Sequence, residues 1–268
     1  MIDEHRHSGI HYENEAGVAL LRVDRPEARN ALSWAAQEAF ARAVDAASGA
    51  AEGGALRVLI ITGTGPAFVA GGDLKELAGY GAPADGARLN RIMSRALDRL
   101  QQLPAPVIAA INGDAVGGGC EILLACDLRL MAAGARLRFA QGAMGLTTGW
   151  GGTARLVRQV GQSRALDLLL TGRAVEAEEA QEIGLIHHIV PPGADTLVEA
   201  QAWARELQKW PRDALAALKR LVYATGSRAD EAVAAYERTL FVQLWGSENH
   251  QEAVRAFLEK RRPRFNQS

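Results

Sequence analysis

Short segments rich in β-branched residues alternate along the chain with longer amphipathic segments, and this alternation constrains the fold more than any other feature. Residues 57–62 are apolar on both faces, which predicts a buried parallel strand. Further strands are expected at residues 18–23, 107–111 and 128–131. Strands that alternate with helices predict an α/β fold in which helices cover a sheet.

The predicted helices change in character after Pro191 and Pro192, where the strand-like segments stop. Before this point we expect helices at residues 33–47, 87–103, 121–126, 152–160 and 164–170. After it, amphipathic helices are expected at residues 196–208, 211–224, 229–245 and 247–261. We therefore predict a core at residues 1–195 and an all-helical region at residues 196–268, which is suited to subunit packing.

Charge and composition disfavour several functional classes. The 268-residue chain has a formal net charge of -1, and its basic residues cluster only near the C-terminus, so no nucleic-acid partner is expected. The first eleven residues lack an apolar signal segment, and no apolar run approaches the roughly 20 residues that span a bilayer. The two cysteines fit neither a zinc nor a C-x-x-C pattern, so we expect a reduced, cytoplasmic protein without a metal.

A glycine triplet, Gly117 to Gly119, stands between a predicted strand and a predicted helix. The first turn of a helix has free N–H donors and the positive end of the helix dipole, and glycine allows a ligand to approach closely. Glu121 follows, within reach of a ligand bound there. The alternative is a tight turn in which Glu121 only interacts with the helix dipole.

A second glycine pair, Gly71 and Gly72, follows Ala70, whose N–H could also face a ligand. Asp73 and Glu76 have the spacing of a capping box, so we expect a helix to start here with Asp73 as its N-cap.

These two segments resemble the paired oxyanion-hole motifs of the crotonase, or enoyl-CoA hydratase/isomerase, superfamily. Residues 24–32 resemble the loop of that family that contacts coenzyme A, and residues 151–156, 170–173, 180–190 and 256–261 resemble its later signatures. The resemblance implies a spiral of ββα units followed by helices. It also implies an acyl-CoA substrate, no separate cofactor, and a homotrimer or a dimer of trimers.

The resemblance also implies roles for individual residues. The N–H groups of Ala70 and Gly118 would bind the thioester oxygen, and Glu121 would transfer protons. The adenine of coenzyme A would lie near residues 25–28 and the Ala70 loop, a phosphate would meet Lys260 in the same or a neighbouring subunit, and the acyl chain would meet residues 141–150. The implied substrate contacts are Arg25, Ala28, Gly71, Asp73, Gln141, Thr148, Trp150 and Lys260.

The chain departs from the hydratase pattern after Phe139. Hydratases of the family have a proline and then a second glutamate in this segment, but here Gly142 and Ala143 stand in their places, and no acid occurs between Asp127 and Asp167. Hydration needs both a base for the water and an acid for the α-carbon. Isomerisation needs one proton shuttle, and decarboxylation of a malonyl-type thioester needs the oxyanion hole and one proton donor. The shortened segment resembles the ethylmalonyl-CoA decarboxylase branch.

Other classes have weaker support. Gly63 and Gly65 follow a strand as in dinucleotide-binding proteins, but Phe68 occupies the position of the third glycine of that fingerprint. The chain has neither the G-x-S-x-G of serine hydrolases nor an H-E-x-x-H metal motif. A non-catalytic acyl-CoA-binding protein on the same scaffold remains a third possibility.

Overall fold

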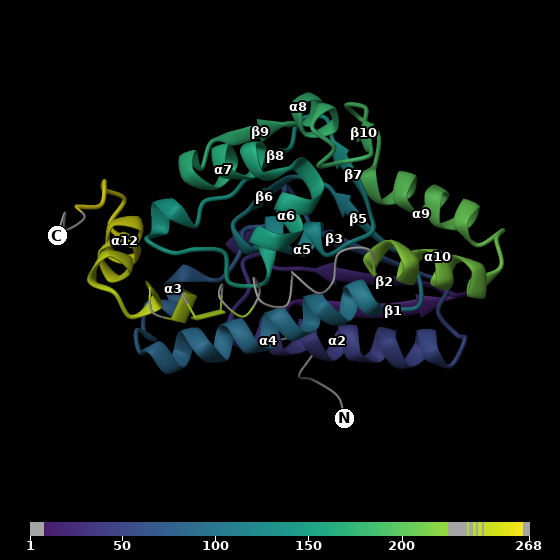
Figure 1. Ribbon diagram of the computed structural model, residues 1–268, viewed down its shortest axis with the longest axis horizontal. Helices are drawn as coiled ribbons and strands as arrows, with labels where there is room; N and C mark the ends of the chain where they lie inside the picture. The colour runs from purple at the N-terminus through teal and green to yellow at the C-terminus, as the bar shows by residue number, and fades with distance from the viewer. Residues whose placement is uncertain (1–7, 225–234, 236–237, 240, 243, 265–268) are drawn as a thin grey trace.

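The computed structural model describes residues 8–224, 235, 238–239, 241–242 and 244–264 (Figure 1). It contains two sheets. The six-stranded sheet has the order β1 (Ile10–Glu15), β2 (Val18–Val23), β3 (Val58–Gly63), β5 (Val107–Ile111), β7 (Leu128–Ala132) and β10 (His188–Val190). The four-stranded sheet has the order β4 (Ala67–Val69), β6 (Asp114–Val116), β8 (Arg136–Arg138) and β9 (Ala174–Glu176).

Successive strands go to alternate sheets. β3, β5 and β7 pair in parallel in the large sheet, while β4, β6 and β8 follow them and pair in parallel in the small one. Helices α4 (Pro83–Gln102) and α5 (Gly118–Leu124) complete the first two of these units. The α/β fold with repeated ββα units is therefore confirmed. Residues 58–62 lie in the buried parallel strand β3, whereas Arg57, the first residue of the predicted segment, lies just before it.

Helices cover both faces of the large sheet. α2 (Trp34–Glu52) packs against α4 and β1 on one face, where the two long helices run side by side (Figure 1). α9 (Thr196–Leu207) packs on the other face, where its Ala200 and Ala204 meet Val58, Ile60 and Ile108. Neighbouring residues of one strand face opposite sides of a sheet, so an apolar strand is buried on both.

The remaining elements are shorter or lie near the C-terminus. They are η1 (Pro26–Ala28), α3 (Leu74–Leu77), η2 (Gly142–Met144), α6 (Gly152–Val160), α7 (Gln162–Thr171), α8 (Ala177–Glu182), α10 (Arg212–Ala224) and α12 (Glu248–Leu258). The helix predicted at residues 229–245 lies largely outside the described residues. No helix in the described ranges is long and apolar enough to cross a membrane.

Some predicted boundaries were wrong for identifiable reasons. α4 begins at Pro83, four residues before the predicted start, because proline suits the first turn and Asp85 accepts the N–H of Ala82 at 3.1 Å. The described elements after Val190 are helices, as predicted. The domain boundary at residue 195 stays a prediction, but α9 packs on the sheet and so belongs to its layers.

A buried ion pair fastens α10 to the core. Lys219 Nζ lies 2.7 Å from Asp127 Oδ2, and both side chains are largely buried. Lys219 also donates to the carbonyls of Leu100 and Ala105, each at 3.0 Å, and the hydroxyl of Tyr223 donates to Asp127 at 2.9 Å. Burial lowers the pKa of Lys219 and raises that of Asp127, so each charge depends on the other.

Lys219→Met should therefore lower the free energy of unfolding by about 3 kcal/mol, because it leaves the carboxylate of Asp127 buried without its cation. Urea denaturation at fixed protein concentration, followed by circular dichroism, measures this loss. Lys209→Met is the control, since Lys209 pairs with Glu206 on the surface and its removal should change stability by no more than about 0.5 kcal/mol. Equal losses in both variants would contradict a special role for the buried pair.

Candidate functional site

The N-terminus of α5 is built by glycines that allow backbones to approach closely. Gly117 has φ +54° between β6 and α5. A Cβ on Gly119 would lie 1.9 Å from the carbonyl oxygen of Val69, so only glycine permits the contact between α5 and the end of β4. Gly118 is the first residue of the helix, where N–H groups have no partner inside the helix.

The loop that contains Ala70 lies against this helix start. A Cβ on Gly71, which has φ +83°, would lie 3.2 Å from both the nitrogen of Gly118 and the carbonyl oxygen of Val116. The two loops meet because β4 and β6 pair in parallel and end at the same edge of the small sheet. Ala70 and Gly118 are half-buried, so part of each residue is exposed at this edge.

The side chain of Glu121 is buried, and four hydrogen bonds surround its carboxylate. Oε2 accepts the N–H of Trp150 at 2.7 Å and of Gly152 at 2.9 Å. Oε1 accepts Nε2 of Gln141 at 3.0 Å and the N–H of Gly149 at 3.3 Å. All four donors are neutral N–H groups, so hydrogen bonds rather than a paired cation replace the hydration of this buried group.

The turn at residues 149–152 folds around this carboxylate. Gly151 has φ +86°, and a Cβ on Gly152 would lie 2.6 Å from Cγ of Glu121. Gly152 also begins α6, so the positive end of that helix faces the anion. The sequence showed residues 151–156 only as a segment that resembles a family signature, and it gave no sign that N–H groups of this turn bind the protein's own Glu121.

The environment of Glu121 affects its pKa in two directions. Burial raises the pKa of the carboxyl group, whereas the bonds from Trp150, Gly149, Gly152 and Gln141 lower it. Burial is the larger effect, so the pKa of Glu121 is raised overall. A buried carboxyl group with a raised pKa is typical of groups that exchange protons near neutral pH.

Two predicted acyl-pocket residues lie beside these groups. The Trp150 indole packs on Gly118, since a Cβ there would lie 2.1 Å from Cζ3 of the ring. Gln141 contacts Glu121, and its Oε1 is buried without a hydrogen-bond partner among the described residues. Thr148 instead faces the start of α6, where its hydroxyl lies 2.6 Å from that of Thr153.

The predicted coenzyme A loop is joined to the Ala70 loop. The N–H of Leu32 donates to the carbonyl of Gly71 at 2.7 Å, and the N–H of Asp73 donates to that of Leu32 at 3.0 Å. Arg25 Nη2 lies 3.0 Å from Asp73 Oδ2, and both side chains are largely buried. These contacts hold Arg25, Gly71 and Asp73 together, with Ala28 half-buried on the same loop.

The helix start predicted at Asp73, with Asp73 at the N-cap position, is confirmed, but the capping-box bonds expected from Asp73 and Glu76 are not formed. α3 does begin after Asp73, but the Asp73 carboxylate makes no capping bond and pairs with Arg25 instead. Glu76 accepts the N–H of Trp34 at 3.0 Å. A charge-assisted bond to arginine outweighs one to a backbone N–H of a four-residue helix.

Lys260 is placed separately, in the turn that follows α12, where it is exposed. α12 itself packs against α3 and η2, the two short elements that follow the Ala70 loop and Gln141 (Figure 1).

The chain is also similar to known proteins along most of its length. The family model described as enoyl-CoA hydratase/isomerase matches residues 13–268. The chain is 37% identical over 248 residues to the 2,3-dehydroadipyl-CoA hydratase of Escherichia coli, covering 92% of this chain and 94% of that protein. It is 38% identical over 198 residues to an ethylmalonyl-CoA decarboxylase of Gallus gallus, covering 73% of this chain and 66% of that protein.

A solved structure is also similar. An enoyl-CoA hydratase/isomerase from Mycobacterium paratuberculosis superposes with a TM-score of 0.86 at 27% identity, covering 92% of this chain and 98% of that chain. The sequence motifs, the paired sheets and these matches together place the chain in the enoyl-CoA hydratase/isomerase family of acyl-CoA enzymes.

Proposed function

We propose that the protein forms and protonates the enolate of an acyl-CoA thioester. The N–H groups of Ala70 and Gly118 bind the thioester oxygen and stabilise the charge that develops on it. Removing one such donor typically costs about 3–4 kcal/mol of transition-state stabilisation. The close approach of Gly71 to the nitrogen of Gly118 supports this pairing, because it brings both loops to one edge of the small sheet.

Glu121 is the acid/base in this proposal, and the groups around its carboxylate are the observation on which the proposed reaction rests. It lies one turn after Gly118 on α5, and all four groups that hydrogen-bond to its carboxylate are neutral. One carboxyl group suffices to remove a proton from one carbon and return it to another. The first candidate reaction is therefore isomerisation of the double bond of an enoyl-CoA.

Hydration makes a further demand on the same group. Relatives such as the Escherichia coli protein are named hydratases. Because Ala143 stands where the second glutamate would be, Glu121 would have to activate the water and also protonate the α-carbon.

Decarboxylation of a malonyl-type CoA is the second candidate. The shortened segment between Gln141 and Thr153 favours it, as do relatives named ethylmalonyl-CoA decarboxylase from Gallus gallus and Bos taurus. The bond between the α-carbon and the carboxylate breaks, and its electron pair forms the thioester enolate as carbon dioxide leaves. Protonated Glu121 then gives its proton to the α-carbon.

The remaining residues bind the substrate in this proposal. Arg25, Ala28, Gly71 and Asp73 lie near the adenine of coenzyme A, and Lys260 contacts a phosphate in the same or a neighbouring subunit. Gln141, Thr148 and Trp150 line the acyl pocket. No separate cofactor is needed, and the protein assembles as a homotrimer or a dimer of trimers.

Glu121→Gln should lower turnover by about 10²–10⁴-fold, the usual contribution of a general acid/base. The assay incubates 2-enoyl, 3-enoyl, methylmalonyl and ethylmalonyl thioesters of CoA with the enzyme in deuterated water and follows them by mass spectrometry. Interconversion of the enoyl species indicates isomerisation, and loss of carbon dioxide with deuterium at the α-carbon indicates decarboxylation. A gain of water on the 2-enoyl species would contradict the argument against hydration.

Glu178→Gln serves as the control for that variant, because Glu178 is exposed on α8. Full turnover by Glu121→Gln would show that the acid/base is another group. Binding of every thioester without any conversion would favour a non-catalytic acyl-CoA-binding protein.

Gln141→Leu should move the acid limb of the pH–rate profile to higher pH. The amide of Gln141 donates to Glu121 and so lowers the pKa of its carboxyl group; without this bond the pKa rises further. A base that must be ionised then loses activity at a higher pH. The profile of kcat/KM measures this shift, and an unchanged acid limb would mean that Glu121 is not the titrating base.

A further inference from the structure

The turn that ends α12 has an unusual residue at its centre. The N–H of Arg261 donates to the carbonyl of Ala256 at 3.0 Å, and the N–H of Lys260 donates to that of Phe257 at 3.2 Å. This is the bonding pattern of a Schellman motif, whose central residue is left-handed and usually glycine. Here that residue is Lys260, with φ +54°.

A lysine at this position is unfavourable for the backbone, because a Cβ crowds the neighbouring carbonyl in the left-handed conformation. A non-glycine residue held in such a conformation is a reason to look for a function of its side chain. Lys260 is exposed, and within the described part of the chain neither Lys260 nor Arg262 has an ion-pair partner. Two cations are therefore available to an anionic ligand.

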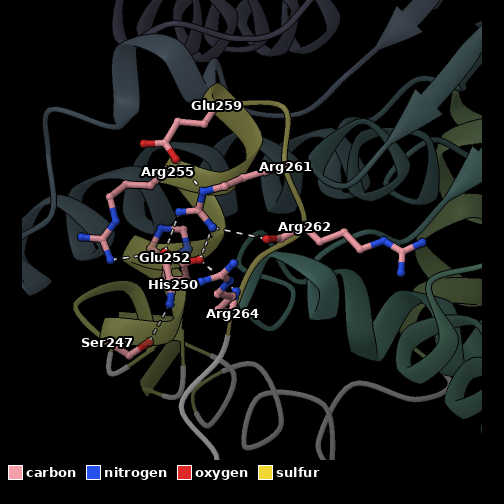
Figure 2. Close-up of polar contacts among 8 residues, drawn as sticks. All are labelled: Ser247, His250, Glu252, Arg255, Glu259, Arg261, Arg262 and Arg264. Atoms are coloured by element: carbon pink, nitrogen blue, oxygen red, sulfur yellow. Dashed lines mark hydrogen bonds and ion pairs between the residues drawn. The ribbon is translucent and has the colours of Figure 1, made fainter.

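The turn is held by Glu252, which lies within α12. Its oxygens bind Arg261 in a bidentate pair, with Oε1 2.5 Å from Nη1 and Oε2 3.0 Å from Nη2 (Figure 2). Oε1 also accepts the N–H of Arg264 at 2.8 Å. The bonds from Arg261 and Arg264 lower the pKa of Glu252 to about 2, so the clamp is charged throughout the neutral range.

The position of Glu252 explains how it can act on Lys260. Its side chain is 13% exposed, whereas that of Arg261 is 37% exposed, so the carboxylate is the more buried partner. It bonds residues on both sides of Arg262, which folds the chain after Lys260 back onto α12. Bidentate arginine–carboxylate pairs fix geometry as well as adding binding energy. Glu252 also compensates the charge of Arg261, whereas no carboxylate within the described residues compensates that of Lys260 or Arg262.

We propose that Glu252 is a positioning residue for coenzyme A: its clamp on Arg261 holds the left-handed turn that presents Lys260 and Arg262 to the phosphates. This inference rests on the proposed function, in which Lys260 contacts a phosphate of the substrate. Glu252 itself does not touch the ligand. It acts by fixing the backbone from which the two cations project.

The test is titration calorimetry of the full-length protein with free coenzyme A, 3′-dephospho-coenzyme A and pantetheine, which lacks the phosphates. Glu252→Gln should raise the Kd for coenzyme A by about fivefold to tenfold. The Kd for 3′-dephospho-coenzyme A should rise by the same factor or a smaller one. The Kd for pantetheine should not change. In a Lys260→Gln background the same change should have a smaller effect, exerted through Arg262 alone, because residues that act through one another are not additive.

The matched control is Glu259→Gln, which removes the other carboxylate bonded to Arg261, at 2.5 Å from Nε, but leaves Arg264 bound to Glu252. It should change the Kd for coenzyme A by less than Glu252→Gln does. Wild-type affinity in Glu252→Gln would overturn the inference, and so would an equal loss for coenzyme A and pantetheine, which would indicate general damage. A wild-type protein that does not bind coenzyme A would overturn the proposed function itself.

Lys260→Gly separates the backbone from the side chain. Glycine suits the left-handed turn, so the variant should unfold at the same temperature as the wild type or a higher one, yet bind coenzyme A more weakly. A variant that is at least as stable and binds coenzyme A with unchanged affinity would contradict the role given to Lys260 and to its clamp.

Discussion

The buried carboxylate of Glu121 is the constraint on which the site depends. Burying an ionised group away from water is costly unless hydrogen bonds replace its hydration. Three backbone N–H groups and one side-chain amide do so here, and they come from a segment about 20 to 31 residues further along the chain. That segment must turn back onto α5, which requires glycine at residue 152 and a left-handed residue at 151. Two helix starts, α5 and α6, are thereby fixed against each other.

This arrangement has a consequence for chemistry on a thioester. Gly118 and Glu121 lie three residues apart on α5, so their separation is set by helix geometry rather than by a mobile loop. Trp150 gives its N–H to Glu121 and packs its ring on Gly118, so one residue contacts both groups. In the proposed reaction, N–H donors that are already in place would need no reorganisation when charge develops on the thioester oxygen, which is the basis of electrostatic catalysis.

The sequence was sufficient to predict the helices and strands that a local pattern of apolar residues specifies. β5 and α6 have the predicted bounds, because a continuous apolar run and a clear helical period specify them. The strands β4, β6 and β8 have three residues each, too few for a period to be recognised. The partners of Glu121 are mainly backbone N–H groups, which every residue but proline has, so their direction follows from the fold alone. Asp73 fits a capping pattern locally, but Arg25, 48 residues away, binds it instead.

The C-terminal helix connects the two ends of the site. His250 of α12 is buried and its Nδ1 lies 2.9 Å from the carbonyl oxygen of Met144, the last residue of η2. A Cβ on Gly145 would lie 3.1 Å from the nitrogen of His250, so the helix start and this turn are in close contact. η2 directly follows Gln141, the side chain that donates to Glu121. The helix whose far end holds Lys260 therefore supports the segment that hydrogen-bonds to Glu121. Under the proposed function, a change in the docking of α12 would affect phosphate recognition and proton transfer together.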